Sequence, residues 1–184
     1  SCGTFELAQV LSEKQIITTF HKYYTIDDYK KFFKKFKNPD YVTYTLGIRD
    51  EDLAQIQAMA KSDLLKHFTF ICIDIPNGYL QRFSNFVRKI RKLCPNHVII
   101  AGNVVSKEMT EELILAGADI VKVGIGSGSA CTTRRMTGVG MPQLSAVIEC
   151  ADAAHGMSSD NGACGLIISD GGAVVPGDVA KAFC

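Results

Sequence analysis

Several features that define common classes of protein are missing from this sequence of 184 residues. No apolar run approaches the length of a membrane span, and the chain does not open on the charged-then-apolar pattern of a secretion leader. Neither sign of charge dominates, since 20 lysines and arginines stand against 19 acidic residues. We therefore expect no membrane partner and no nucleic-acid partner.

Paired metal-binding or redox cysteine motifs are also absent. The seven cysteines contain no C-x-x-C pair, and their odd number argues against a framework of disulfides. They are Cys2, Cys72, Cys94, Cys131, Cys150, Cys164 and Cys184. The four histidines show no metal-ligand spacing, which argues against a structural zinc site. We expect reduced thiols in the cytoplasm, with Cys72, Cys94, Cys150 and Cys164 as packing residues.

One basic run interrupts the balanced charge, between residues 30 and 37. Its spacing suits a helix with Phe32, Phe33 and Phe36 turned inward and the lysines in water. A solvated helix face explains this run better than a nucleic-acid patch.

Amphipathic and apolar segments alternate along the whole chain. We expect helices at 5–11, 25–36, 50–66, 79–93, 106–116 and 142–154 and from 176 onward, and strands at 16–20, 41–46, 68–75, 98–102, 120–123 and 166–169. Thr4 and Ser106 are candidate N-caps, Thr25 with Asp28 resembles a capping box, and Pro176 suits a first helical turn.

This alternation predicts an α/β fold with a parallel sheet covered by helices. Polar or glycine residues follow nearly every expected strand, which favours a (β/α)8 TIM barrel over an open sheet. A helix without a preceding strand begins the chain, and one without a following strand ends it. We therefore expect residues 1–184 to form a single partial barrel domain of about six central βα units. Its first and last strands are expected to be missing, and the chain alone is expected to be inactive.

The loop after the strand at 120–123 is the most informative segment. Gly124, Gly126 and Gly128 free the backbone there, and the loop ends on Cys131 beside Thr133. A cysteine at the edge of such a loop is placed like a nucleophile whose thiolate is stabilised. A glycine-rich turn followed by a buried cysteine is the competing interpretation.

Four segments then carry a resemblance to a known family: 101–105, 123–134, 138–156 and 168–172. They resemble the guanosine monophosphate (GMP) reductases, which share a (β/α)8 family with the inosine monophosphate (IMP) dehydrogenases. The residues in segments 143–146 and 149–152 match the pattern of the reductases. The direct passage from His21 into the next helix also favours a reductase, because dehydrogenases usually carry a large insertion there.

The resemblance implies reductive deamination of GMP by NADPH, giving IMP and ammonia. Cys131 would add to C2 of the purine as a thiolate and form a covalent thioimidate. Thr133 would transfer protons with the help of a glutamate that the family carries beyond the position of residue 184.

Further roles follow from the resemblance residue by residue. Asp170 would bind the ribose hydroxyls, and Ser129, Gly171 and Gly172 would contact the phosphate. The positions that would contact the cofactor are Lys22, Asp74, Ile75, Pro76, Ile125 and Gly126. Carbonyl oxygens of Gly126, Gly128 and Cys131 would hold a potassium ion, with Arg134 as a further member of that site. A homotetramer is also implied.

Two departures from the family pattern bear on the cofactor: Pro76 replaces a usual alanine, and Ser127 stands where the reductases often have proline. Two alternatives remain open. One is an IMP dehydrogenase relative in which water attacks the same thioimidate, and the other is a truncated barrel that binds purine nucleotide without catalysis.

Overall fold

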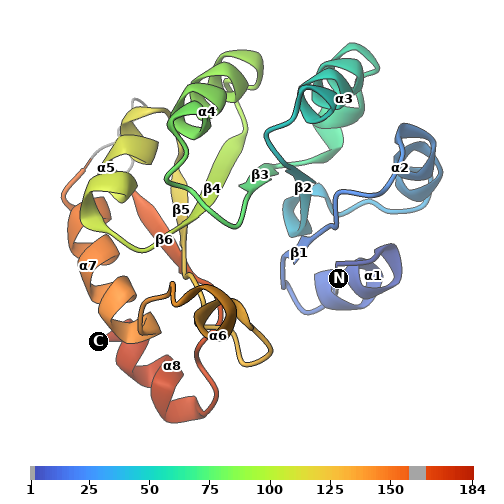
Figure 1. Ribbon diagram of the computed structural model, residues 1–184. Helices are drawn as coiled ribbons and strands as arrows, with labels where there is room; N and C mark the ends of the chain where they lie inside the picture. The colour runs from blue at the N-terminus through green and yellow to red at the C-terminus, as the bar shows by residue number, and fades with distance from the viewer. Residues whose placement is uncertain (1–2, 158–164) are drawn as a thin grey trace. The chain divides into compact units, whose positions relative to one another are not determined.

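The computed structural model describes residues 3–157 and 165–184. The chain divides into two compact units (Figure 1). The first contains Ser1–Asp74 and Leu93–Ile99, and the second contains Ile75–Lys92 and Ile100–Cys184. The expectation of one partial barrel domain stays a prediction.

The first unit contains three parallel strands in the order β1, β2, β3. Its elements are α1 (Phe5–Ser12), β1 (Thr18–Thr19), α2 (Ile26–Phe33), a 3-10 turn (Pro39–Tyr41), β2 (Val42–Leu46), α3 (Asp50–Lys61), a second 3-10 turn (Leu64–His67) and β3 (Phe70–Asp74). Thr18 stands opposite Val42, and Thr43 stands opposite Phe70. The first strand is shorter than the predicted segment 16–20.

Side-chain caps begin the first two helices as the sequence predicts. Thr4 Oγ1 accepts a hydrogen bond from Leu7 N at 3.3 Å. Thr25 and Asp28 form the predicted capping box, in which each side chain accepts from the other's backbone N–H. The third helix ends earlier than predicted, at Lys61, because Asp63 adopts a left-handed φ of 61° that an α-helix cannot contain.

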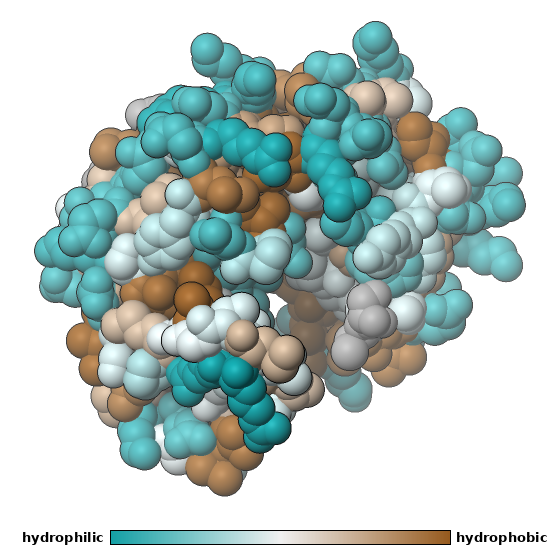
Figure 2. All heavy atoms as spheres, in the orientation of Figure 1, coloured by the Kyte–Doolittle hydropathy of each residue, from teal (hydrophilic) through white to brown (hydrophobic). Residues whose placement is uncertain are grey.

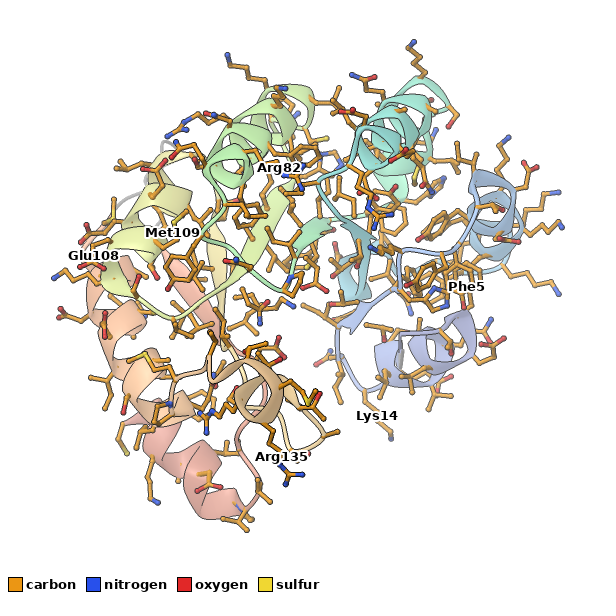
Figure 3. The ribbon with its side chains drawn as sticks, in the orientation of Figure 1. Phe5, Lys14, Arg82, Glu108, Met109 and Arg135 are labelled. Atoms are coloured by element: carbon orange, nitrogen blue, oxygen red, sulfur yellow. The ribbon has the colours of Figure 1, made fainter. Side chains whose placement is uncertain are left out.

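Aromatic rings fill the interior of the first unit. The Phe5 ring lies between α1 and α2 (Figure 3), stacked on Tyr24 at 3.7 Å and on Phe32 at 4.3 Å between ring centroids. Phe20 and Tyr29 are buried and meet the same group of rings. Phe32, Phe33 and Phe36 are all buried, which confirms their predicted inward orientation. The outer face of α2 is hydrophilic (Figure 2).

The second unit contains strands β4, β5 and β6, which pair in parallel in that order. Its elements are α4 (Gln81–Leu93), β4 (Val98–Val104), α5 (Lys107–Leu115), β5 (Ile120–Val123), α6 (Thr133–Thr137), α7 (Gln143–His155), β6 (Leu166–Ser169) and α8 (Pro176–Phe183); Leu93 and the first two residues of β4 belong to the first unit. The bounds of β5 and β6 are those predicted, whereas the short α6 was not expected.

Helices of the second unit are joined by charged side chains. Ser106 occupies the N-cap of α5 without a side-chain capping bond, contrary to its predicted role. Glu149 of α7 accepts from Lys107 N at 3.1 Å instead, so a carboxylate stands at the positive end of α5. Arg91 of α4 donates to Gly117 O at 2.9 Å and forms an ion pair with Asp119.

The α/β prediction is confirmed, because the strands alternate with helices and each pairing within the units is parallel. Cys72, Cys94 and Cys150 are buried, as expected of packing residues, while Cys164 lies outside the described residues. None of the described helices is both long and apolar enough for a membrane span. Leu166 and Ile168 of β6 are exposed, and the corresponding part of the second unit shows an apolar area (Figure 2).

Candidate active site

The loop after β5 is held by backbone bonds, and its Gly124 and Gly126 adopt positive φ values that strain other residues. Gly124 N donates to Val104 O at 2.9 Å, and Cys131 N donates to Gly128 O at 3.0 Å. Gly126 has a φ of +72°, and a Cβ there would stand 3.0 Å from Cγ of Arg134. The sequence therefore brings Cys131 to the end of a tightly held loop.

Cys131 lies beside Thr133 on this loop and is exposed, so the interpretation of a buried cysteine is wrong. The Cys131 Sγ and Thr133 Oγ1 atoms are 3.2 Å apart. Hydrogen bonds from the side chain and backbone of Thr133, followed by the positive charge of Arg134, lower the pKa of the Cys131 thiol. In contrast, burial raises the pKa of the Cys150 thiol. The arrangement favours a thiolate at Cys131.

Arg134 braces the same loop from α6. Its Nη2 donates to Met141 O at 2.6 Å, and Met141 N donates to Ile125 O at 3.1 Å. A guanidinium has no acceptor atom, so its side chain cannot ligate a cation. Its neighbour Arg135 points from α6 into solvent (Figure 3).

Asp170, directly after β6, is held by two side chains from neighbouring strands. Asn103 Nδ2 donates to Asp170 Oδ2 at 2.7 Å and to Gly124 O at 2.8 Å. Lys122 Nζ lies 3.3 Å from the same Oδ2. Ser127 Oγ donates to the backbone oxygen of Asp170 at 3.2 Å. These bonds join the ends of β4, β5 and β6.

Gln143, the first residue of α7, contacts the ends of β5 and β6, the two strands that lead into the glycine loops. Its Nε2 donates to Val123 O at 2.8 Å and to Ser169 Oγ at 3.0 Å. Gly172 has a φ of +77°, and a Cβ there would stand 2.6 Å from Gln143 Cβ. A Cβ at Gly171 would stand 3.2 Å from Cα of Gly128. The two loops predicted to meet the phosphate are therefore packed against one another.

The predicted site residues fall in both units. Cys131, Thr133, Ser129, Asp170, Gly171, Gly172, Ile125, Gly126, Gly128, Arg134, Ile75 and Pro76 belong to the second unit, and Lys22 and Asp74 belong to the first. Asp74, the last residue of β3, is exposed. Ile75 is buried, and its N–H and C=O are both bonded to the end of β4. Its predicted contact with a cofactor stays a prediction.

Two surface grooves lie outside this cluster. One, of about 480 Å³, is lined by Phe5, Phe32 and lysines of the first unit. The other, of about 390 Å³, lies between the starts of α4 and α5 and is lined by Tyr79, Glu108 and Met109 among others. Neither contains a residue that the sequence predicts for catalysis. The described residues hold no group of three or more histidines, cysteines or acids that could bind a metal.

Asn103, Lys122 and Gln143 are site residues to which the sequence alone assigns no role. A signal for Lys122 exists, because it is a lone cation inside the apolar strand Ile120–Val123. Gln143 has no comparable signal, since a polar residue at the start of a helix usually faces water.

Known proteins match this chain over nearly its whole length. The domain described as "IMP dehydrogenase / GMP reductase domain" matches residues 7–184. A protein named GMP reductase from Serratia proteamaculans (strain 568) is 54% identical over 186 residues, which cover 100% of this chain and 51% of that protein. One of the same name from Onchocerca volvulus is 50% identical over 185 residues, covering 98% and 49%.

A solved structure agrees. The crystal structure of inosine 5′-monophosphate dehydrogenase from Legionella pneumophila superposes with a TM-score of 0.79 at 31% identity, covering 96% of this chain and 50% of that one. The chain thus spans about half the length of these relatives. The predicted fold class, an incomplete (β/α)8 TIM barrel, is confirmed. On sequence and fold together, this chain belongs to the IMP dehydrogenase/GMP reductase family.

Proposed function

We propose that this chain carries the nucleophile and part of the nucleotide site of an NADPH-dependent GMP reductase. The observation that supports it best is the exposed Cys131 thiol, 3.2 Å from the Thr133 hydroxyl, whose pKa is lowered. The 50–54% identity to proteins named GMP reductase supports this reaction over that of the 31% identical dehydrogenase.

The chemistry uses Cys131 as the attacking group. Its thiolate forms a bond to C2 of the purine, and the bond from C2 to the exocyclic nitrogen breaks as that nitrogen takes a proton and leaves as ammonia. We propose that Thr133 relays this proton; the contact of its hydroxyl with the Cys131 sulfur, at 3.2 Å, supports this role. A nicotinamide cofactor, when bound, would supply the hydride for reduction at C2, and the Cys131 thiolate would leave as IMP forms.

Several residues of this chain are suited to bind the phosphate of the substrate and the cofactor. Gly171 and Gly172, both with positive φ, lie against the loop at Ser127 and Gly128 and are proposed to cradle the phosphate together with Ser129. Lys22, which is exposed, is proposed to offer an ammonium to a cofactor phosphate. The other residues proposed to contact the cofactor are Asp74, Ile75, Pro76, Ile125 and Gly126.

A potassium ion is proposed at the backbone carbonyls of Gly126, Gly128 and Cys131. Carbonyl oxygens replace the hydration shell of potassium in other proteins, so this donor set suits the ion. Arg134 would serve by bracing the loop through Met141 O and not by ligation. We further propose a cytoplasmic homotetramer, which the molar mass of the complete protein from light scattering would test.

Substitution of Cys131 tests the proposal. In the complete protein, Cys131→Ala should keep GMP binding and lose essentially all NADPH oxidation, because no other group replaces a covalent nucleophile. Cys150→Ala is the matched control, since that thiol is buried and should be dispensable for turnover. Turnover of Cys131→Ala near the parent rate would contradict the assignment.

Two further assays separate the alternatives. An IMP dehydrogenase would oxidise IMP with NAD and fail to reduce GMP. A protein that binds purine nucleotide without catalysis would bind GMP in calorimetry but turn over neither substrate.

A further inference from the structure

We infer that Lys122 and Asn103 are positioning residues for the ribose of the nucleotide: they hold one oxygen of Asp170 and leave the other to bind the vicinal hydroxyls. The inference rests on the proposed function, in which Asp170 contacts the ribose. It adds that the carboxylate acts as one member of a three-residue unit from β4, β5 and the end of β6.

Both donors converge on the same carboxylate oxygen. Asn103 Nδ2 lies 2.7 Å and Lys122 Nζ 3.3 Å from Asp170 Oδ2. Within the described part of the chain, Asp170 Oδ1 accepts no hydrogen bond, and the side chain is 45% exposed. One oxygen is thus anchored and the other is available to a ligand from solvent.

The orientation of the Asn103 amide follows from its partners. Its Nδ2 donates to Gly124 O and to Asp170 Oδ2, and both of these atoms can only accept. A flipped amide would place its oxygen against both acceptors. Asn103 therefore ties the Asp170 carboxylate to the start of the loop that carries Cys131.

Lys122 is placed for this contact by its surroundings. Its side chain is only 18% exposed, and its neighbours Val121 and Val123 are fully buried. A poorly hydrated ammonium is stable only beside an opposite charge. Gly102 of β4 stands opposite Lys122 in the sheet, and a Cβ there would lie 2.7 Å from Lys122 Cβ. The absence of a side chain at Gly102 leaves room for the lysine stem.

A carboxylate that binds a diol benefits from such anchoring. The χ2 torsion of a free aspartate is broad, so its two oxygens sample many directions. Two donors on Oδ2 restrict that rotation, and Oδ1 then faces the ligand in one orientation. Loss of Lys122 should therefore weaken the binding of the ribose without altering the groups that react at C2.

The test compares two substrates in the complete protein. GMP presents both hydroxyls, whereas 2′-deoxy-GMP lacks one. Lys122→Met keeps the length of the side chain and removes its charge; we expect it to raise KM for GMP about tenfold, the size of one hydrogen bond to a charged group, with kcat little changed. The KM for 2′-deoxy-GMP should rise much less, and Lys122→Arg should restore the preference for GMP.

Asp170→Asn and Asn103→Ser complete the set. Asp170→Asn should reduce the preference for GMP over 2′-deoxy-GMP; an unchanged preference would overturn the ribose assignment and this inference together. If Asp170→Asn reduces the preference but Lys122→Met weakens both substrates equally, Lys122 is only structural and the inference alone is overturned. Asn103→Ser, which removes the amide without adding bulk, should lower the preference in the same direction and gives a reading even if Lys122→Met does not fold.

Discussion

Different interactions hold the two units together. Rings of Phe20, Tyr29 and Phe68 meet one another at 5.5–6.3 Å between centroids in the first unit. The second unit has a mainly aliphatic interior, with Phe83 and Phe86 of α4 as its buried phenylalanines, and directed polar bonds such as that of Asn103 to Asp170 join its strand ends. Ring packing tolerates small displacements, whereas a hydrogen bond fails beyond about 3.5 Å. The unit with directed bonds is the one that bears Cys131.

The largest effect is expected from a substitution that destabilises the core of the first unit and leaves the reactivity of Cys131 in the second unit unchanged. Phe20→Ala should reduce the free energy of unfolding by about 3–5 kcal/mol, because Phe20 is 1% exposed and its loss leaves a cavity among rings. Urea unfolding measures the change. Tyr23→Ala is the control, since Tyr23 is 76% exposed and should cost little. The alkylation rate of Cys131 in folded Phe20→Ala should match the parent rate; a large change would mean that the aromatic core also shapes the loop.

A second prediction concerns backbone conformation in the second unit. Gly172→Ala should cost about 1–3 kcal/mol, because a φ of +77° is strained for alanine and its Cβ would stand 2.6 Å from Gln143. Gly177→Ala is a matched control in α8, where nothing lies within 4 Å of an added Cβ. It should be neutral or stabilising by up to about 1 kcal/mol. Equal costs in urea unfolding would contradict the close packing of the two loops.

The fold could be predicted further than the site. The apolar pattern of the sequence predicts the bounds of β5 and β6 correctly. The capping-box pattern of Thr25 and Asp28 predicts the start of α2. The early end of α3 could not be predicted, because the left-handed turn at Asp63 is set by tertiary packing and not by a glycine. The hydrogen bond from Lys107 N at the start of α5 to Glu149 could not be predicted either, since it joins residues far apart in the sequence.

The sequence predicts candidate site residues, but it does not predict the contacts that those residues make. Cys131 and Thr133 are close in the sequence: Thr133 begins α6, Thr132 is its N-cap, and Cys131 directly precedes that cap. Lys122 and Gln143 were missed because their partners stand on other strands, and a single sequence contains no record of which strands are adjacent. Only the unusual placement of a lysine in an apolar strand hints at such a contact.

The smallest expected effect sharpens the description of the thiol. Thr133→Val removes the hydroxyl that contributes most to the lowered pKa of Cys131, so that pKa should rise. The rate of iodoacetamide reaction against pH measures it, because only the thiolate reacts. Since a lowered pKa gives more thiolate at neutral pH, the variant should react more slowly there, with its titration midpoint at higher pH. Thr132→Val, one residue away, should leave the midpoint unchanged; a similar shift in both variants would remove the specific role of Thr133.

Trapping the covalent intermediate tests the central proposal most directly. The complete protein would be mixed with GMP and NADPH and quenched in acid during turnover. It would then be digested, and the mass of each cysteine-containing peptide would be measured by mass spectrometry. We expect the peptide that contains Cys131 to gain the mass of GMP less ammonia, and the Cys131→Ala protein to form no adduct. Continued turnover by Cys131→Ala, or an adduct on another cysteine such as Cys150, would contradict the account.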